Sequence, residues 1–236
     1  MFTKSAEFYD LIYSGKDYQG ESVALIEQIK RRKPNATRIL DICCGTAEHR
    51  KYLNKVFQID GLDLNEDFIN QAKKKNPNGT FYVADMSDFE LHKQYDVLIC
   101  LFSSIGYVKT FDQLIATLKC FHKHLKDGGL MIVEPWLTPE NWYHGKVHML
   151  TREEDDFKIC RMNRSDTKGN LSILHFHYLV GSSENGVVHF EEKHELALFT
   201  EDEMKRAFNE GSFEVTFDKE GITGRGLYYG VKKNIA

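Results

Sequence analysis

The stretch RILDICCGTAEH, residues 38–49, joins an apolar run of strand length to a turn that contains Gly45. Asp41 lies near the end of the run, and beyond Gly45 we expect a helix. A glycine at such a turn lets the backbone approach a ligand, and the N-terminus of a following helix offers free N–H groups to an anionic group. The stretch therefore predicts a ligand-binding loop of the nucleotide type at the end of a buried strand.

Around this stretch, apolar runs of strand length alternate with amphipathic stretches of helix length from Thr37 to Val133. Runs rich in Ile, Leu and Val are typical of strands that are buried on both faces. We expect such strands at 38–43, 57–64, 80–85, 95–102 and 130–135. A helix should precede the first of them and end at Pro34. The alternation predicts an α/β fold, doubly wound around a mostly parallel sheet.

The pattern changes after Glu134. Three stretches between residues 146 and 198 alternate polar and apolar residues with a period near two, and turn clusters separate them. We expect them to form a small antiparallel β insert after the fifth strand. Thr200 and Glu203 then form a capping box for a helix, and two final strands bring the main sheet to seven.

Cap and stop residues delimit the helices between the strands of the main sheet. Asn65 is a suitable N-cap for the helix that follows the second strand. Gly128 and Gly129 are expected to end the helix that precedes the fifth strand.

The composition excludes several classes of protein. The chain has 236 residues, with 31 Lys and Arg against 35 Asp and Glu, and a formal net charge of −4. It carries no global basic field that would gather phosphate backbones, so we expect no nucleic-acid partner. Apolar runs such as YDVLICLF are far shorter than the roughly 20 residues that cross a bilayer, so we expect no membrane association.

The cysteines and the start of the chain indicate a cytoplasmic protein. Five cysteines without a CxxC pair, placed in apolar segments, argue for reduced thiols. Cys43 and Cys44 are interpreted as small buried residues at a strand end rather than a redox pair. The first ten residues lack the apolar segment of a secretory signal.

Three acidic residues lie near the ends of the first three predicted strands: Asp41, Asp63 and Asp85. In open parallel sheets, ligands bind outside the carboxyl ends of the strands, so we expect these carboxylates in one crevice. A dinucleotide loop needs several glycines to wrap a diphosphate, whereas this loop keeps only Gly45. Asp41 would also repel a diphosphate. These features disfavour a nicotinamide-dependent oxidoreductase.

S-adenosylmethionine fits the charge pattern better because it carries no phosphate. Its α-ammonium group suits a carboxylate or a loop carbonyl, and its α-carboxylate suits a helix N-terminus. Asp63 would accept both ribose hydroxyls, and Asp85 would accept the exocyclic amine of adenine. The three acidic positions thus have three separate tasks.

The segment around these residues resembles class I S-adenosylmethionine-dependent methyltransferases over roughly residues 37–135. A narrower resemblance covers nearly the whole chain. The blocks YDLIYSGKDY, FSSIGY, VEPWLTPENW, HFHYLV and GRGLYYGV are similar to N,N-dimethyltransferases of nucleotide-linked amino deoxysugars, of the desosamine and mycaminose type.

The resemblance implies a site for S-adenosylmethionine and a site for the acceptor. The implied cofactor-binding residues are Tyr9, Tyr18, Asp41, Cys43, Gly45, His49, Asp63, Leu64, Asp85, Met86 and Phe102. The implied acceptor-binding residues are Tyr13, Tyr107, Trp136 and Arg225, and Tyr107 lies at a position close to the sugar amine in related enzymes. Tyr107 is the predicted catalytic residue. Catalysis would consist mainly of holding a neutral amine and the methyl donor at attack distance in a dry pocket.

The same resemblance suggests a division of the chain. Residues 1–36 would form an N-terminal lid and helix, and residues 37–145 with 199–236 the domain that binds S-adenosylmethionine. Residues 146–198 would form the insert that shapes the acceptor pocket.

Alternatives stay open at this stage. Related enzymes carry a tyrosine ahead of the position of Tyr9, whereas this chain has Met1 and Phe2 there. The acceptor could therefore be another small molecule with an N or O nucleophile, or the protein could bind S-adenosylmethionine without turnover. The oligomeric state is open.

His175 and His177 stand two apart on one strand, which is a spacing found in metal sites. No Cys or carboxylate cluster joins them at a convincing spacing, so we expect no metal.

Overall fold

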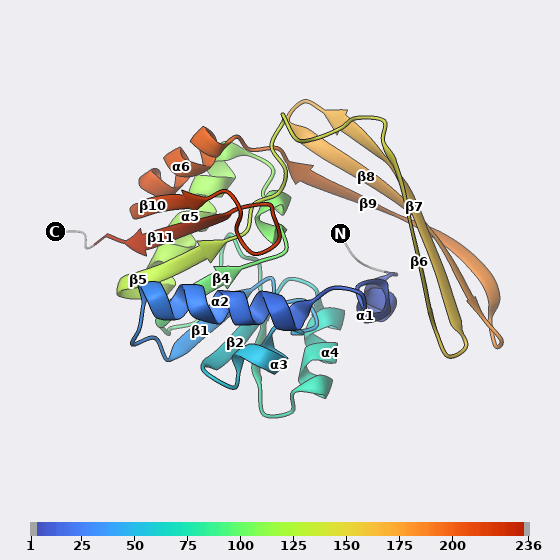
Figure 1. The fold of residues 1–236 in the computed structure, drawn as a ribbon, viewed down its shortest axis with the longest axis horizontal. Coiled ribbons are helices and arrows are strands. Elements are labelled where there is room, and N and C mark those ends of the chain that lie inside the picture. The colour runs from blue at the N-terminus through green and yellow to red at the C-terminus, as the bar shows by residue number, and fades with distance from the viewer. Residues whose placement is uncertain (1–3, 234–236) are drawn as a thin grey trace.

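The computed structural model describes residues 4–233 and contains two β-sheets. A seven-stranded sheet has the order β10-β11-β5-β4-β1-β2-β3, and a four-stranded sheet has the order β6-β7-β8-β9. Figure 1 shows the four-stranded sheet standing beside the larger α/β unit, with α1 between them.

The strands of the larger sheet are β1 (Arg38–Ile42), β2 (Gln58–Asp63), β3 (Thr80–Val83), β4 (Tyr95–Cys100), β5 (Leu125–Val133), β10 (Phe213–Asp218) and β11 (Leu227–Lys232). Those of the smaller sheet are β6 (Val147–Glu154), β7 (Phe157–Lys168), β8 (Leu171–Ser182) and β9 (Gly186–Ala197). The α-helices are α1 (Tyr9–Ile12), α2 (Tyr18–Arg32), α3 (Arg50–Leu53), α4 (Glu66–Lys75), α5 (Phe111–His124) and α6 (Glu201–Glu210). Two 3₁₀ helices are η1 (Ala6–Phe8) and η2 (Ser104–Tyr107).

The larger sheet is parallel except for β11. Strand β1 pairs in parallel with both β2 and β4, which places the reversal of strand order beside β1. Strand β11 runs antiparallel to β5 and to β10. The mostly parallel seven-stranded sheet is confirmed, and its ligand crevice is expected outside the ends of β1 and β4.

Helices cover both faces of this sheet, which confirms the doubly wound architecture. On one face, Leu25 and Ile29 of α2 pack with the alternate strand residues Ile39, Val97 and Ile132. On the other face, side chains of α5 and α6 pack against the intervening strand residues. In Figure 1, α2 crosses the front of the sheet while α5 and α6 lie behind it. Among the described residues, no helix is long and apolar enough to span a membrane.

The antiparallel insert is also confirmed, but it has four strands where three stretches were expected. The first stretch divides into β6 and β7 at a turn in which Asp155 has a φ of 46°. Asp is one of the few residues that tolerates this left-handed conformation, so the acidic pair Asp155–Asp156 reverses the chain.

Two local predictions were wrong. The helix expected directly after Gly45 is only the four-residue α3, which begins at Arg50. Gly128 and Gly129 do not end a helix, because α5 stops at His124 and both glycines lie within β5. Leu125 is already extended and buried in the core, so strand pairing begins before the glycines are reached.

The helices α4 and α6 begin where the sequence predicted them. Asn65 accepts hydrogen bonds from the amides of Asp67 and Phe68 at the start of α4, as an N-cap does. The Thr200–Glu203 capping box is present, and all five cysteines are free thiols.

Candidate functional site

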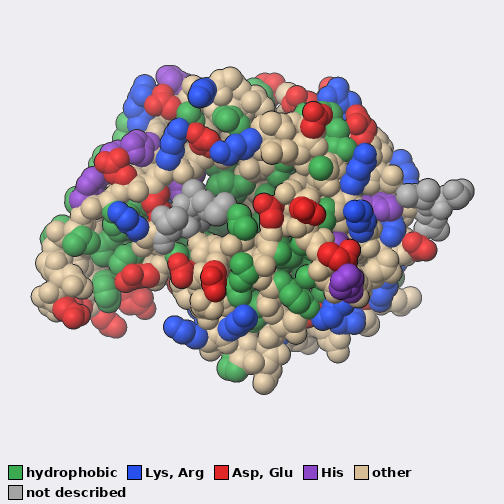
Figure 2. All heavy atoms as spheres, turned by 180° about the vertical axis from the view of Figure 1, so that it is seen from behind, with side chains coloured by type: hydrophobic (Ala, Val, Ile, Leu, Met, Phe, Trp, Pro, Cys, Tyr) green, Lys and Arg blue, Asp and Glu red, His purple; other side chains and the backbone are tan. Residues whose placement is uncertain are grey.

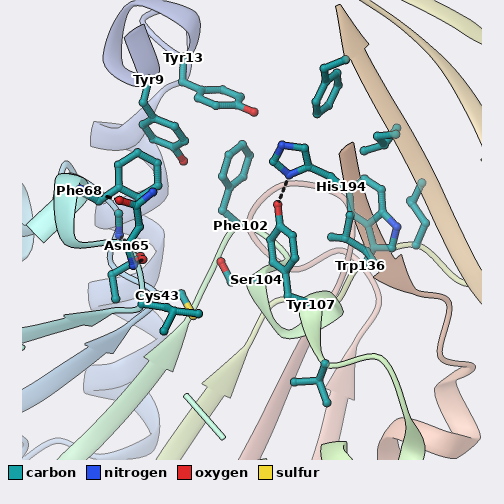
Figure 3. A pocket seen from close by; sticks show the side chains of 18 of the residues that line it. Tyr9, Tyr13, Cys43, Asn65, Phe68, Phe102, Ser104, Tyr107, Trp136 and His194 are labelled. Atoms are coloured by element: carbon teal, nitrogen blue, oxygen red, sulfur yellow. Dashed lines mark hydrogen bonds between the residues drawn. The ribbon is translucent and has the colours of Figure 1, made fainter. Parts of the chain in front are cut away.

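A cavity of about 630 Å³ lies between the carboxyl ends of the parallel strands and the inner face of the insert. Twelve of the predicted site residues line it: Tyr9, Tyr13, Cys43, Gly45, Asp63, Leu64, Asp85, Met86, Phe102, Tyr107, Trp136 and Arg225. Figure 3 shows Tyr9, Phe68 and Asn65 on one side of this space, opposite Tyr107, His194 and Trp136.

The remaining predicted residues line a smaller cavity of about 40 Å³ beside the first. It is bordered by Tyr18, Asp41 and His49, and it shares Tyr9, Cys43, Gly45 and Phe102 with the larger one. The structure therefore brings all of the predicted site residues to two adjoining cavities at one edge of the sheet.

The loop after β1 has an unusual backbone. Cys43, Gly45 and Ala47 have φ values of 60°, 54° and 64°, so every second residue is left-handed. Only glycine adopts this conformation without steric cost. The alternation prevents a helix from starting at Gly45, which explains why the predicted helix N-terminus is absent there. Instead, the Gly45 amide donates to Asp63 Oδ2 at 2.9 Å.

The three acidic residues have different environments. Asp41 is buried, and burial raises its pKa to about 7. Asp63 accepts the amides of Gly45 and Asn65, at 2.9 Å each, and burial raises its pKa while these hydrogen bonds oppose the rise. Asp85 is exposed, and its Oδ1 accepts the amide and hydroxyl of Ser87. Asp85 also lines the larger cavity.

His49 and Tyr18 form the outer wall of the small cavity. His49 Nε2 lies 2.9 Å from Glu21 Oε2, and Glu21 also pairs with Lys16. The ring of Tyr18 packs edge-on against His49, with centroids 4.9 Å apart. These contacts connect the start of α2 to the loop after β1.

A buried carboxylate holds the loop after β4. Glu134, directly after β5, accepts the amide of Phe102 at 2.6 Å and the hydroxyl of Thr223. Phe102 and Ser103 are left-handed, with φ values of 52° and 62°. Arg225 donates to Ser103 Oγ at 3.2 Å, so the segment before β11 is tied to the same loop.

Tyr107 makes a contact that the sequence did not reveal. Its hydroxyl lies 2.6 Å from Nδ1 of His194 on β9 (Figure 3). Burial lowers the pKa of His194 and raises the pKa of Tyr107 well above its ordinary value. The pair is therefore a neutral phenol that donates to a neutral imidazole. His194 Nε2 lies 3.8 Å from Glu192 Oε2, which favours the tautomer with the proton on Nε2.

Two further cavity residues on the insert were missed. Arg161 and Asn163 stand two apart on β7, and both line the cavity. Arg161 donates to Tyr13 Oη at 3.1 Å, whereas Asn163 Nδ2 is buried and has no hydrogen-bond partner among residues 4–233. Because alternate residues of a strand point to the same face, their spacing of two could have identified them as residues on the cavity side of β7.

Aromatic side chains from the N-terminal segment close one end of the cavity. Tyr9 packs on Phe68 of α4 with centroids 4.7 Å apart, and Tyr13 packs edge-on against Phe102 at 5.1 Å. At the other end, Trp136 donates from Nε1 to Ser172 Oγ at 2.8 Å, so its ring is fixed by the insert. Met1 and Phe2 lie outside the described residues.

His175 and His177 are not in the cavity. They project from the opposite, solvent-exposed face of the insert, and neither lines the site described above.

Comparisons with known proteins identify a matching family and a similar enzyme. A family model described as a methyltransferase domain matches residues 39–129. The chain is 36% identical to dTDP-3-amino-3,6-dideoxy-alpha-D-glucopyranose N,N-dimethyltransferase of Streptomyces fradiae, over 96% of this chain and 90% of that protein.

Two solved structures resemble this chain over almost its whole length. The crystal structure of Streptomyces venezuelae DesVI superimposes with a TM-score of 0.92 at 35% identity, covering 99% of this chain and 100% of that one. SAM-bound CalS10, an amino pentose methyltransferase from Micromonospora echinaspora, gives a TM-score of 0.86 at 27% identity, covering 99% and 98%.

Proposed function

Because this chain belongs to the S-adenosylmethionine-dependent methyltransferases, in the family of the dTDP-amino-sugar N,N-dimethyltransferases, we propose that it methylates the amino group of a nucleotide-linked deoxysugar. Its cofactor is S-adenosylmethionine. One observation carries the proposal: a single cavity extends from the acidic strand ends to a polar and aromatic region beneath the insert, with Tyr107 in its wall.

The chain's own residues fit the cofactor. The buried carboxylate of Asp41 accepts no hydrogen bond from the described residues, and it needs a cationic partner such as the α-ammonium group. Asp63 accepts backbone N–H groups on both oxygens, and its carboxylate has more acceptor sites than these bonds occupy, so Asp63 can still accept a ribose hydroxyl. Asp85 and Met86 would hold the adenine. When bound, S-adenosylmethionine supplies an electrophilic methyl group on a positively charged sulfur.

Tyr107 is proposed to position the acceptor amine. Since its hydroxyl proton points to His194, the oxygen lone pairs are left to accept an N–H of the amine. This hydrogen bond would fix the orientation of the amine and leave its nitrogen lone pair available for attack on a methyl group. After methylation, the amine proton can pass to Tyr107 Oη while the Tyr107 proton passes to His194 Nδ1. Burial lowers the pKa of His194, but Glu192 lies close by and raises it, so Glu192 would stabilise the proton on the imidazole.

The far end of the cavity supports a sugar nucleotide as the acceptor. Asn163 Nδ2 is a buried donor that requires an acceptor, and a sugar or phosphate oxygen would satisfy it. Arg225 and Arg161 offer guanidinium groups suited to phosphate oxygens, and Trp136 offers a flat surface for a sugar or base.

Residues 1–36 are proposed to act as a lid over this cavity, and residues 146–198 as the wall of the acceptor pocket. The amide and hydroxyl of Ser5 both bond the carboxylate of Glu192 on β9, so the N-terminal segment is tied to the insert. Tyr9 and Tyr13 cover the region between them. Exclusion of water by such a lid protects the neutral amine and strengthens the polar contacts inside.

The proposal is tested by incubating the purified protein with S-adenosylmethionine and either dTDP-3-amino-3,6-dideoxyglucose or its 3-hydroxy counterpart. We expect the mass of one or two added methyl groups on the amino sugar alone. Tyr107→Phe should lower kcat roughly 10- to 100-fold, the worth of one buried hydrogen bond of about 1.4–2.7 kcal/mol. Its effect on cofactor affinity should be small.

Tyr143→Phe is the matched control, because Tyr143 is exposed and does not line the cavity. Methylation of the hydroxy sugar, or of neither sugar in a protein that binds the cofactor, would contradict the amine assignment. Equal kcat values in Tyr107→Phe and Tyr143→Phe would contradict the role of Tyr107.

A further inference from the structure

Three imidazoles and a carboxylate converge on the outer face of the insert, which is the face turned away from the cavity. His175 and His177 lie on β8, and His189 and Glu191 lie on the neighbouring β9. Their side chains are between 44% and 49% exposed, so a dissolved ion can reach them. Figure 2 shows histidine side chains gathered beside an acidic one over the insert, at the left of that view.

Strand pairing explains why these four meet. His177 stands directly opposite Glu191, while His175 and His189 are each one diagonal step away from that pair. On one face of an antiparallel pair, direct and diagonal neighbours are close enough for long side chains to touch. From spacing alone no carboxylate could be assigned to His175 and His177, and the register of β9 supplies one.

The ligand atoms of His175, His177 and Glu191 all lie within 4.8 Å of one another, which is close enough for one ion to contact all three after small side-chain rotations. A zinc ion with Zn–N bonds of 2.0–2.1 Å separates its ligand atoms by about 3.3 Å. His177 Nδ1 lies 3.4 Å from His189 Nε2 and 3.4 Å from Glu191 Oε1. His175 Nε2 lies 2.8 Å from Glu191 Oε2, and His189 Nε2 lies 4.0 Å from Glu191 Oε1.

The surrounding charges are already compensated. Lys193, opposite His175 on β9, pairs with Glu195 at 2.7 Å. Arg164, opposite His175 on β7, pairs with Asp166 at 3.0 Å. The Glu191 carboxylate lies 2.8 to 4.0 Å from a ring nitrogen of each of the three histidines.

We propose that this face carries a binding site for a divalent transition-metal ion, held by His175, His177 and Glu191, with His189 beside His177 as a further ligand that the ion can recruit. Imidazole nitrogen with one carboxylate oxygen is a donor set that favours zinc, copper, nickel or cobalt over magnesium or calcium. The ion would link β8 to β9 on the side of the sheet opposite His194 and Asn163. The site is separate from methyl transfer, and its function would be to stabilise the insert.

The test is a calorimetric titration of the full chain, freed of any affinity tag and of metal, with zinc chloride. Cobalt chloride, followed by visible absorption, reports whether the ion is tetrahedral. We expect one equivalent of zinc to bind and to raise the midpoint of thermal unfolding. His177→Ala, which removes the central ligand, should weaken binding roughly tenfold or more.

Two control variants separate this site from other sources of binding. His92→Ala removes an exposed histidine outside the insert, and Cys160→Ser removes a thiol on the same face; both should bind zinc as the parent does. Circular dichroism confirms that each variant is folded. Absence of zinc binding by the parent, equal affinity in His177→Ala, or loss of binding in Cys160→Ser would each overturn the proposal.

Discussion

Replacing Asp63 with alanine should lower both the stability of the protein and its affinity for S-adenosylmethionine. The Gly45 amide is buried and donates to Asp63, so the substitution removes the acceptor of a buried donor at a cost of about 1–3 kcal/mol. The amide of Asn65 is less buried and can bond to water. At roughly 2–4 °C per kcal/mol for a chain of this size, a cost of about 2 kcal/mol lowers the midpoint of thermal unfolding by about 4–8 °C.

The loss of affinity is larger if Asp63 holds the ribose. Two hydrogen bonds to a charged acceptor, at about 1.5 kcal/mol each, correspond to roughly 100-fold in Kd. Calorimetric titration with S-adenosylmethionine, below the unfolding range of the variant, measures this directly. Asp63→Asn keeps an acceptor oxygen for Gly45 and should recover most of the stability but only part of the affinity.

Asp88→Ala is the matched control, because Asp88 is an exposed carboxylate close to Asp85 that does not line the cavity. It should leave both quantities unchanged. Parental affinity in Asp63→Ala would refute the assignment of the ribose to Asp63, whatever happened to the stability.

Two other substitutions test the buried carboxylate and the helix cap. Because burial raises the pKa of Asp41 to about 7, its contribution to stability is complete below the ordinary carboxyl pKa near 3.8 and is lost as the pH rises through about 7. Without cofactor, the protein should therefore lose stability relative to Asp41→Asn between pH 4 and pH 8 in thermal unfolding; a difference that is independent of pH would contradict the burial argument. Thr200→Ala removes the cap of α6 and should cost about 1 kcal/mol, or roughly 2–4 °C, whereas Glu203→Gln keeps the reciprocal hydrogen bond and should cost much less. Equal losses in the two variants would show that the capping box is not what stabilises the start of α6.

Much of the site could be predicted from the sequence because its signals are local. Asp41 and Asp63 each lie near the end of an apolar run, and a parallel sheet brings such ends to one edge. The period-two pattern after Glu134 likewise predicted an antiparallel insert, since alternating burial is a property of each strand by itself.

Backbone conformation in the loop after β1 was less predictable. Cys43 and Ala47 are left-handed although neither is glycine, and so the expected helix at Gly45 does not form. Local preference disfavours this conformation, and the contacts of the folded loop, such as the bond from Gly45 to Asp63, maintain it.

The sequence by itself therefore determined the fold class and the edge of the sheet at which the acidic residues lie, because the hydrophobic period and the ends of strands are properties of short segments. Only the tertiary structure joined Tyr107 to His194, brought Asn163 over the cavity and placed Glu191 beside His177. These pairs come from separate elements, and their distances depend on strand register and on how the insert folds back over the sheet. Neither the strand register nor the position of the insert can be derived from the spacing of residues along the chain.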